Sequence, residues 1–248
     1  MPFINSISGK MGFGRPSRSS VPAPVLLLTL DAGDTDSYPG SGAIWTDLIG
    51  GKTFTLNGSP TYSSDDGGYL NFVPSSSQYA QCATSLPTIK TWTVEAWHYY
   101  TGTNSGGTPS IVTEIYPGGA QDLNYSLGAT GAGGNSATVA ASLYDLGAGG
   151  WQSTNTAYTF PTNNAWYYVV GTYDGTDLKL YVNGTLVDTH SYTGVLTSSG
   201  GGIRLMRRWE SSDYWGGRLS IVRIWRGDIG STNITATFDS EKTRFGLT

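Results

Sequence analysis

Hydrophobic and polar residues alternate most clearly between residues 166 and 189, WYYVVGTYDGTDLKLYVNGTLVDT. A period of two is typical of β-strands with one buried face. Asp174-Gly175 and Asn183-Gly184 interrupt it, and such pairs favour tight hairpin turns because they adopt positive φ at low cost. The segment therefore predicts three antiparallel strands. Pairing of Tyr173 with Leu178 would place five side chains on one sheet face: Val169, Tyr173, Leu178, Leu180 and Val182.

Shorter apolar runs recur along the rest of the chain. Residues 25–30, VLLLTL, are apolar until Asp31, as expected of a buried strand. Gly-rich segments at residues 128–137 and 146–150 are typical of loops. Further strands are predicted at residues 78–83, 111–116, 124–127, 138–143 and 203–209.

The composition agrees with one folded all-β domain. Charged residues make up 13% of the 248 residues, against about 25% in average soluble domains. Gly accounts for 35 residues, and 12% of residues are aromatic. Many short strands, Gly-rich turns and aromatic side chains are typical of β-sandwiches, which are routine at this length. A chain this apolar is not disordered throughout.

Cysteine usage and the apolar runs bear on the cellular compartment. The single cysteine, Cys82, excludes an intrachain disulfide, and we expect it to be a small buried residue rather than a nucleophile. Residues 1–10 lack the basic and apolar regions of a secretory signal, and the run at 25–30 is too short to span a membrane. We therefore expect a protein made in a cytoplasm, with no membrane span.

The first 24 residues differ from the rest of the chain. They are rich in Gly, Ser and Pro, show neither strand nor helix period, and carry three bases without an acid. Their spaced apolar residues are not needed in a plain linker, so we predict an extended arm at residues 1–24 that binds a partner, followed by the sandwich at residues 25–248. Three positive charges are too few to predict nucleic-acid binding. The predicted anchoring residues are Phe3, Ile4, Ile7, Lys10, Met11, Phe13, Arg15 and Arg18.

Several motifs resemble the laminin G-like branch of the concanavalin A-like lectins. The Trp-led strand at 166, the turn YDG at 173–175 and LYVNG at 180–184 resemble the central hairpin of this family. LDAG at 30–33 and SYPGSG at 37–42 resemble the opening of a subgroup common in phage and marine viral proteins.

The resemblance extends over about residues 25–247. Segments 68–73, 91–97 and 214–229 resemble three strands of the family, and 231–244 resembles its terminal helix, with Ser231 as the cap. The resemblance implies an all-β fold, an antiparallel jelly-roll β-sandwich, in a class of domains that mostly bind rather than catalyse.

Some proteins with this fold are glycosidases, which need two carboxylates flanking the scissile bond. The chain has four Glu residues and no E-x-D-x-E strand, and Glu95 and Glu114 stand alone on predicted strands. Neither His98 nor His190 lies near a Ser, Cys or Asp that would indicate a catalytic triad. We therefore predict that the protein is not an enzyme.

The resemblance also implies a calcium site, because many laminin G-like domains bind Ca²⁺ at the rim of the sandwich. Calcium takes six to eight oxygen ligands, so several acids from different loops must converge. The first candidates are Asp31 and Asp47, followed by Asp34, Asp36, Asp122 and Asp145. The alternative is that these Asp residues cap turns.

Aromatic residues near Gly-rich loops and near the C-terminus are candidate contacts for a glycan or a protein, since Tyr and Trp are enriched at interfaces. Six Arg residues between 204 and 226 predict a solvated or Tyr-stacked strand face. Four other tryptophans, Trp92, Trp97, Trp166 and Trp225, match core positions of the family and are not candidates. The candidates are Tyr116, Tyr144, Trp151, Trp209, Tyr214 and Trp215.

These features together predict a non-enzymatic structural protein of a virus particle, most simply a bacteriophage. The arm would anchor the domain in many copies on other virion proteins, as capsid decoration or a tail or fibre component. The lectin-like sandwich would face outward and bind host-surface glycans or another cell-surface polysaccharide. The alternatives are a free bacterial carbohydrate-binding module, expected to be a monomer with a mobile arm, and a glycosidase.

Overall fold

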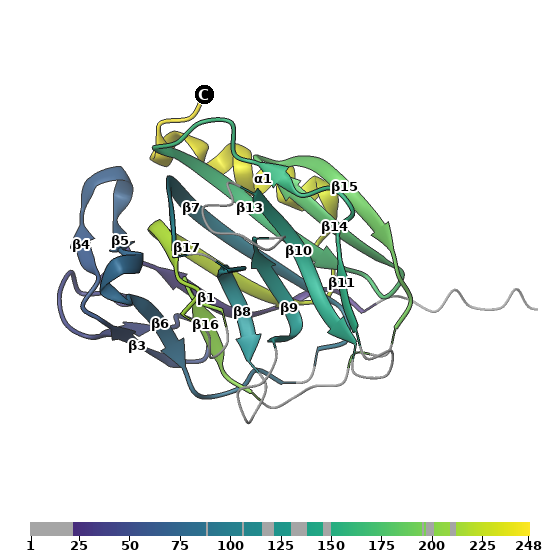
Figure 1. Ribbon diagram of the computed structural model, residues 1–248, viewed down its shortest axis with the longest axis horizontal. Helices are drawn as coiled ribbons and strands as arrows, with labels where there is room; N and C mark the ends of the chain where they lie inside the picture. Colours follow the sequence, from purple (N-terminus) through teal and green to yellow (C-terminus); the bar gives the residue numbers. More distant parts are fainter. Residues whose placement is uncertain are drawn as a thin grey trace, which may run out of the picture.

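Two antiparallel β-sheets packed face to face form the body of the molecule (Figure 1). The computed structural model describes residues 22–87, 89–105, 107–115, 122–129, 138–145, 150–194, 196, 201–208 and 212–248. Within these residues the chain is nearly all β, as the sequence predicts. The short helices are η1 (Asp65–Gly67), η2 (Pro74–Ser76), α1 (Gly230–Glu241) and η3 (Lys242–Phe245).

The sheet that carries the predicted hairpins, here called sheet A, contains the first and the last strand of the described chain. Its strands are β1 (Val25–Asp31), β4 (Thr61–Ser63), β5 (Tyr69–Phe72), β7 (Trp92–Asn104), β13 (Ala165–Tyr173), β14 (Asp177–Val182), β15 (Thr185–Ser191) and β17 (Trp215–Arg226). Their order is β15-β14-β13-β7-β17-β5-β4, with β1 beside β17.

The opposite sheet, sheet B, is built from the middle of the chain. Its strands are β2 (Ile44–Thr46), β3 (Thr53–Asn57), β6 (Tyr79–Cys82), β8 (Ser110–Ile115), β9 (Asp122–Gly128), β10 (Thr138–Asp145), β11 (Gly150–Ser153), β12 (Tyr158–Thr159) and β16 (Ile203–Leu205). Their order is β11-β10-β9-β8-β16-β6-β3-β2, and β12 pairs with β10.

The double hairpin of β13, β14 and β15 forms as predicted. Tyr173 pairs with Leu178, and Val182 pairs with Thr185. Between the second pair, Asn183 and Gly184 have φ values of 49° and 75°, the left-handed conformations that a two-residue turn of type I′ requires. All five side chains predicted to share one face lie in the core between the sheets.

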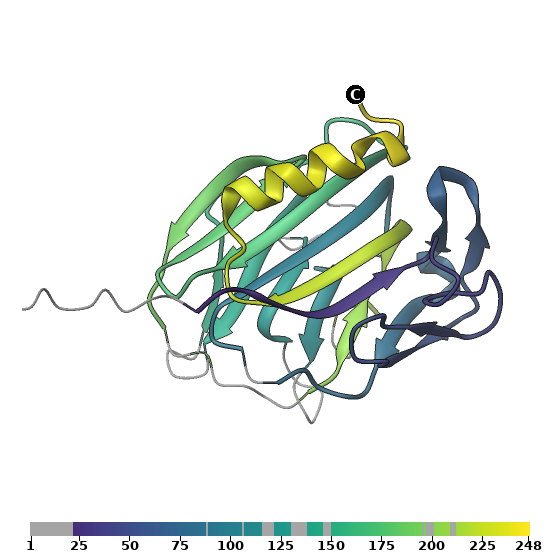
Figure 2. The same ribbon diagram turned by 180° about the vertical axis from the view of Figure 1, so that it is seen from behind.

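The outer face of sheet A is also buried, which the period-two pattern did not predict. Helix α1 lies across this face (Figure 2). The Trp97 ring stacks on Phe238 of the helix at 5.9 Å and on Phe245 of η3 at 4.1 Å between centroids. Both faces of the central strands of sheet A are therefore buried, one against sheet B and the other against α1 and η3.

Two local details differ from the sequence-based expectations. Helix α1 starts after Ile229 without a side-chain cap, so the predicted role of Ser231 is wrong. The carboxylate of Asp228 instead accepts a hydrogen bond of 2.8 Å from the Gly230 amide. The strand predicted at 203–209 is regular only through Leu205, because Met206 adopts a positive φ of 62°.

The prediction that Cys82 is a small buried residue agrees with the structure. Its thiol donates a weak hydrogen bond of 3.5 Å to the carbonyl of Thr84. Among the described residues, no helix combines the length and the apolarity needed to cross a membrane.

Candidate functional site

The outer face of sheet B carries a row of polar side chains that runs across the sheet. Alternate residues on the same strands, such as Leu127, Leu143 and Leu205, lie in the core, so the residues between them point outward. Cross-strand pairing then aligns the outward positions from β11 to β3. The row consists of Ser153, Ser142, Ser126, Thr113, Arg204, Gln81 and Thr55.

Two of the predicted aromatic candidates form a pair at one end of this face. Tyr144 of β10 and Trp151 of β11 are direct cross-strand neighbours, and their ring centroids lie 5.3 Å apart in an edge-to-face arrangement. The Trp151 side chain is 37% exposed. The guanidinium carbon of Arg208 lies 5.0 Å from the centre of the Trp151 ring, a distance at which a cation and an aromatic ring attract each other.

The contact between Arg208 and Trp151 shows that this face is not flat. Arg208 follows β16, and three strands separate β16 from β11. Four strand spacings correspond to roughly 19 Å in a flat sheet, which is beyond the reach of the two side chains. The segment that follows β16 therefore reaches back across the face towards β11. Consistent with this geometry, Thr113 and Ser126 point outward beneath it and are nonetheless buried.

A second aromatic cluster lies farther along the same face. The Arg207 guanidinium carbon is 4.7 Å from the ring centre of Tyr79 and 5.1 Å from that of Tyr214. Arg204 donates a hydrogen bond of 3.0 Å from Nε to Oε1 of Gln81. Beside them is a hollow of about 360 Å³, whose lining offers hydroxyl and amide groups: Thr53, Thr55, Asn57, Tyr79, Gln81, Ala83 and Thr84.

We call these two clusters, with the hollow between β3 and β6, the sheet-B face. Its principal side chains are Tyr79, Gln81, Tyr144, Trp151, Arg204, Arg207, Arg208 and Tyr214. The structure thus brings together three predicted candidates, Tyr144, Trp151 and Tyr214. Sequence reasoning missed Tyr79, although the period-two pattern of β6 places it outward, opposite in direction to the buried Cys82.

The other candidates have different outcomes. Trp215 is fully buried, so its prediction as a surface contact is wrong. Its indole nitrogen donates to His98 inside the core, which explains why an aromatic residue followed by two glycines is not at the surface. Tyr116 and Trp209 lie outside the described residues, and so do all eight predicted anchoring residues of the arm.

The Arg residues between 204 and 226 divide into stacked and buried groups. Arg207 follows the predicted Tyr-stacked arrangement, and Arg218 lies between the rings of Tyr69 and Tyr99 at 4.5 and 4.1 Å. Arg223, in contrast, forms ion pairs with Glu95 and Glu241 beneath α1.

The two principal calcium candidates do not offer their oxygens to a metal ion. Asp31 accepts hydrogen bonds of 2.6 and 2.7 Å on its two carboxylate oxygens from Arg244, so the carboxylate is already paired with the guanidinium cation. Asp47 accepts from the backbone amides of Thr29, Ile49 and Gly50. Among the described residues, no group of three or more His, Cys, Asp or Glu side chains could hold a metal ion. The donor set present therefore does not fit Ca²⁺, which needs converging oxygens.

The two Glu residues that stand on predicted strands, Glu95 and Glu114, lie in different layers. Glu95 points to the outer side of sheet A, beneath α1, whereas Glu114 pairs with the core residue Ile203 in sheet B and is buried. Such an arrangement cannot flank one scissile bond. His98 is also unsuitable as a base, because complete burial lowers its pKa to about 3.

Glu95 belongs to a buried network of hydrogen bonds and an ion pair. Tyr168 and the indole of Trp225 donate hydrogen bonds to its carboxylate, and Arg223 lies 3.5 Å away. Burial raises the pKa of Glu95, and the nearby Arg223 and the two hydrogen bonds offset only part of this effect. Arg223 and Trp97 also bind Glu241, so this buried network attaches α1 to sheet A.

The fold and the sequence together define a lectin-like domain. The profile of the concanavalin A-like lectin/glucanases superfamily, Laminin_G_3, matches residues 74–235, which is more than half of the chain, so the protein belongs to this family. No curated protein sequence matches the chain.

Solved structures with the same fold are distant in sequence. Domain 4 of AbnA, a GH43 extracellular arabinanase from Geobacillus stearothermophilus, solved in complex with arabinotriose, has 15% identity and a TM-score of 0.63, covering 87% of this chain and 98% of that domain. The botulinum neurotoxin serotype G binding domain has 13% identity and a TM-score of 0.64, covering 88% of this chain and 52% of the other.

The binding domain of Paraclostridial Mosquitocidal Protein 1 is similar to the same degree, with 13% identity and a TM-score of 0.66, covering 90% of this chain and 55% of that one. The chain therefore spans about half the length of these two toxin binding domains. At such identities the similarity shows the fold, which confirms the predicted jelly-roll sandwich, and it does not by itself assign a ligand.

Proposed function

We propose that the protein is a non-enzymatic carbohydrate-binding protein and that the sheet-B face contacts the glycan. The observation that carries this proposal is the position of Trp151, whose exposed ring is held between Tyr144 and Arg208. An aromatic surface binds the apolar side of a sugar ring, and nearby polar groups orient its hydroxyls. Gln81, Asn57 and the Thr hydroxyls around the hollow supply further such groups on the same face, at strands β3 and β6.

Two further observations support binding rather than catalysis. Glu95 and Glu114 lie in different layers, so they do not form the acid and nucleophile pair of a glycosidase. Domain 4 of the arabinanase AbnA, nearly the whole length of which aligns with this chain, was solved with arabinotriose. A saccharide ligand is therefore compatible with this fold.

The test is a glycan array followed by calorimetry with the best ligand. Trp151→Ala should weaken binding at least about tenfold, equivalent to about 1.4 kcal/mol, because the ring that stacks on the sugar is removed. Leu186→Ala is the matched control, since Leu186 is an exposed apolar residue of β15 in the other sheet. Equal binding by the Trp151→Ala variant and the wild type would contradict the proposal.

We also propose that the protein is a structural component of a virus particle. Residues 1–24 would bind capsid or tail proteins, and many copies would present the sandwich outward. The support comes from the sequence: apolar residues spaced along a Gly, Ser and Pro-rich segment, a basic charge, and the phage-like opening motif at residues 30–42. The alternative is a free carbohydrate-binding module of a bacterium.

Limited proteolysis at Lys10, Arg15 and Arg18 distinguishes these settings. We expect cleavage in the isolated protein and protection in a particle fraction, with native mass measured by size exclusion and light scattering. Deletion of residues 1–20 should leave the sandwich folded and prevent incorporation into particles. Full incorporation of the truncated protein would contradict anchoring by the arm, and a monomer cleaved under every condition would favour the free module.

A further inference from the structure

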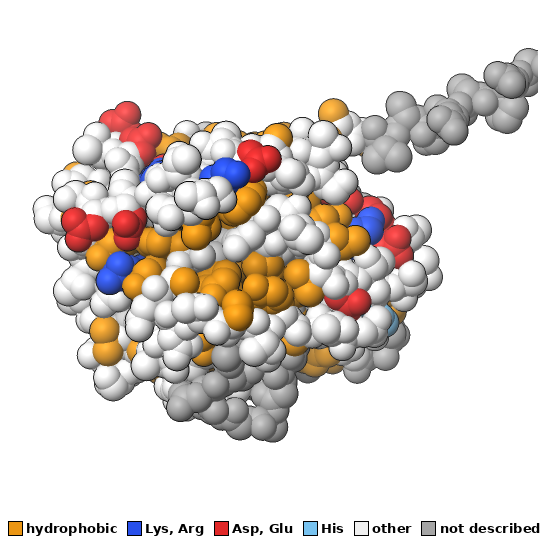
Figure 3. Space-filling view, turned by 90° about the horizontal axis from the view of Figure 1, so that it is seen from above, with side chains coloured by type: hydrophobic (Ala, Val, Ile, Leu, Met, Phe, Trp, Pro, Cys, Tyr) orange, Lys and Arg blue, Asp and Glu red, His pale blue; other side chains and the backbone are white. Residues whose placement is uncertain are grey.

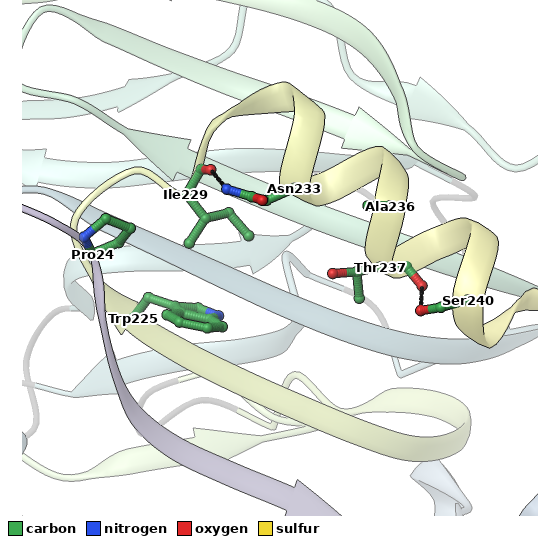
Figure 4. A pocket seen from close by; sticks show the side chains of 7 residues that line it. All are labelled: Pro24, Trp225, Ile229, Asn233, Ala236, Thr237 and Ser240. Atoms are coloured by element: carbon green, nitrogen blue, oxygen red, sulfur yellow. Dashed lines mark hydrogen bonds between the residues drawn. The ribbon is translucent and has the colours of Figure 1, made fainter.

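A second hollow lies on the other side of the sandwich, between helix α1 and the edge formed by β1 and β17. Its volume is about 430 Å³, within the range of roughly 300–1,000 Å³ that is usual for small-molecule sites. Figure 4 shows Trp225 below the helix, with Pro24 at one end of the hollow. We call it the Trp225 hollow, and its lining residues are Pro24, Trp225, Ile229, Asn233, Ala236, Thr237 and Ser240.

The Trp225 ring is held in a fixed position. Its backbone pairs with Leu26 of β1 on one side and Thr93 of β7 on the other. Its indole N–H donates a hydrogen bond to the buried carboxylate of Glu95. The ring therefore cannot rotate without leaving that buried carboxylate short of a donor, which is unfavourable. The family resemblance predicts that Trp225 is a core residue, but in the structure its side chain is partly exposed.

Helix α1 leaves the hollow open because small residues face it. Asn233, Thr237 and Ser240 are spaced by four and three residues, so they lie along one side of the helix. The large apolar residues Ile234 and Phe238 point elsewhere, into the cluster around Trp97 and Tyr168. A leucine on the Trp225 side would fill the space, whereas the hydroxyl and amide groups present do not.

The remaining hydrogen-bonding capacity of the lining consists of neutral amide and hydroxyl groups. Nδ2 of Asn233 donates to the carbonyl of Ile229 at 2.6 Å, and the Ser240 hydroxyl donates to the carbonyl of Thr237 at 2.9 Å (Figure 4). These bonds leave Oδ1 of Asn233 and the side-chain oxygens of Thr237 and Ser240 able to accept, and the second N–H of Asn233 and the Thr237 hydroxyl able to donate. The lining contains no ionisable side chain, and the Trp225 indole that borders it is bonded to the carboxylate of Glu95.

We propose that the Trp225 hollow is a binding site for a neutral saccharide. An indole face and a proline ring offer apolar contact to one side of a pyranose, and three acceptor oxygens match its hydroxyl donors. A carboxylated or sulfated sugar is disfavoured, because the lining has no cationic side chain to pair with its charge. Figure 3 views the molecule from above and shows a central group of hydrophobic side chains, with charged side chains distributed around it.

This site is separate from the sheet-B face, because the two lie on opposite sheets of the sandwich. Each can therefore bind or fail to bind a ligand without the other, and the proposal does not depend on the function proposed above. Occupation of both would make one domain bivalent, which raises avidity for a polysaccharide without any new contact.

The test follows the indole Nε1–H resonance of Trp225 in the ¹⁵N-labelled full chain, assigned with Trp225→Phe. Titration with mono- and short oligosaccharides of glucose, galactose, mannose and xylose should shift this resonance. Thr237→Leu should weaken binding at least tenfold, because the larger side chain fills the hollow without touching Glu95. Thr232→Leu is the matched control, since Thr232 is exposed on the same helix but does not line the hollow.

Three results would overturn the proposal. The resonance could remain unshifted by every saccharide, or Thr237→Leu could bind as tightly as Thr232→Leu. The third is loss of the Trp225 shift in Trp151→Ala, which would assign the effect to the sheet-B face. If Trp151→Ala weakens glycan binding but keeps the shift of the Trp225 resonance, the Trp225 hollow is supported. If the wild type binds glycan through Trp151 and the Trp225 resonance does not shift, only the sheet-B face is supported.

Discussion

The indole Nε1–H of Trp215 donates a hydrogen bond of 2.8 Å to Nε2 of His98 between the two sheets. An indole nitrogen can only donate, so Nε2 must be the unprotonated nitrogen of the imidazole. The other ring nitrogen, Nδ1, lies 3.0 Å from the carbonyl of Arg218 and must therefore carry the proton and donate. The two partners thus select one neutral tautomer of a fully buried histidine.

The first prediction is a loss of stability in acid that originates from His98. Its pKa is about 3 in the folded protein because of burial, against an ordinary value of 6.5. Between these values the unfolded chain binds a proton that the folded protein does not, so the free energy of unfolding decreases as the pH falls from about 6.5 to about 3. The contribution is up to about 1.4 kcal/mol per pH unit.

Urea unfolding of the wild type and His98→Gln over this pH range measures the effect. The variant should be less stable near neutral pH and should show a flatter dependence. Glu95 acts in the opposite direction, because its pKa is raised by burial, so the difference between the two proteins isolates His98. His190→Gln, which changes the partly exposed imidazole of β15, should retain the wild-type slope. Identical slopes for all three proteins would exclude His98 as the source.

The second prediction concerns the network beneath α1. Arg223→Ala should lower the free energy of unfolding by about 3–5 kcal/mol, because it removes the cation beside the buried Glu95 and the bond to Glu241. Adding Glu95→Gln should recover part of the loss, since the buried charge is then absent. Lys242→Ala is the control, because its partner Asp239 is 57% exposed and such pairs contribute about 0–1 kcal/mol. Equal effects of Arg223→Ala and Lys242→Ala in denaturant unfolding would contradict this account.

The third prediction concerns the contact between the sheets at Gly171. A Cβ atom there would lie 2.8 Å from Cδ2 of Leu127 and 3.0 Å from Cβ of Ala141, both in sheet B. Gly171→Ala should therefore destabilise the protein by about 1–3 kcal/mol through overpacking. The neighbouring Thr172→Val should keep or raise the melting temperature, because the buried Thr172 hydroxyl has no hydrogen-bond partner within the described part of the chain. Calorimetry measures the melting temperatures of both variants. If Gly171→Ala melted at a higher temperature than Thr172→Val, the sheets would not be tightly packed against each other at Gly171.

The fourth prediction is that calcium does not stabilise the fold. Both carboxylate oxygens of Asp31 are taken by Arg244, and Asp47 is bound to three backbone amides. The melting temperature should therefore be the same in EDTA and in millimolar calcium. Asp31→Asn should lower it in both solutions, because it weakens a charge-assisted pair. A calcium-dependent rise in the wild type that Asp31→Asn abolishes would restore the calcium site that the family resemblance implies.

The hairpins of sheet A were predictable because their information is local. Asn183-Gly184 specifies a turn, the turn specifies the register, and the register places Leu178 and Leu180 on one face. The sheet-B face was predictable only in part. Alternation directs Tyr144 and Trp151 to the same side, but the approach of Arg208 crosses three strands, a contact between distant residues that no local pattern encodes.

The sequence by itself determined the all-β class, the order and direction of the main hairpins and the core face of β13 and β14, because turn chemistry and period-two alternation act over a few residues. Only the tertiary structure decided that Trp215 is buried and Trp225 partly exposed, since each depends on what packs against it: His98 from β7 in one case, the small residues of α1 in the other. Burial of a side chain depends on neighbours brought together by the whole fold, and flanking residues do not report it.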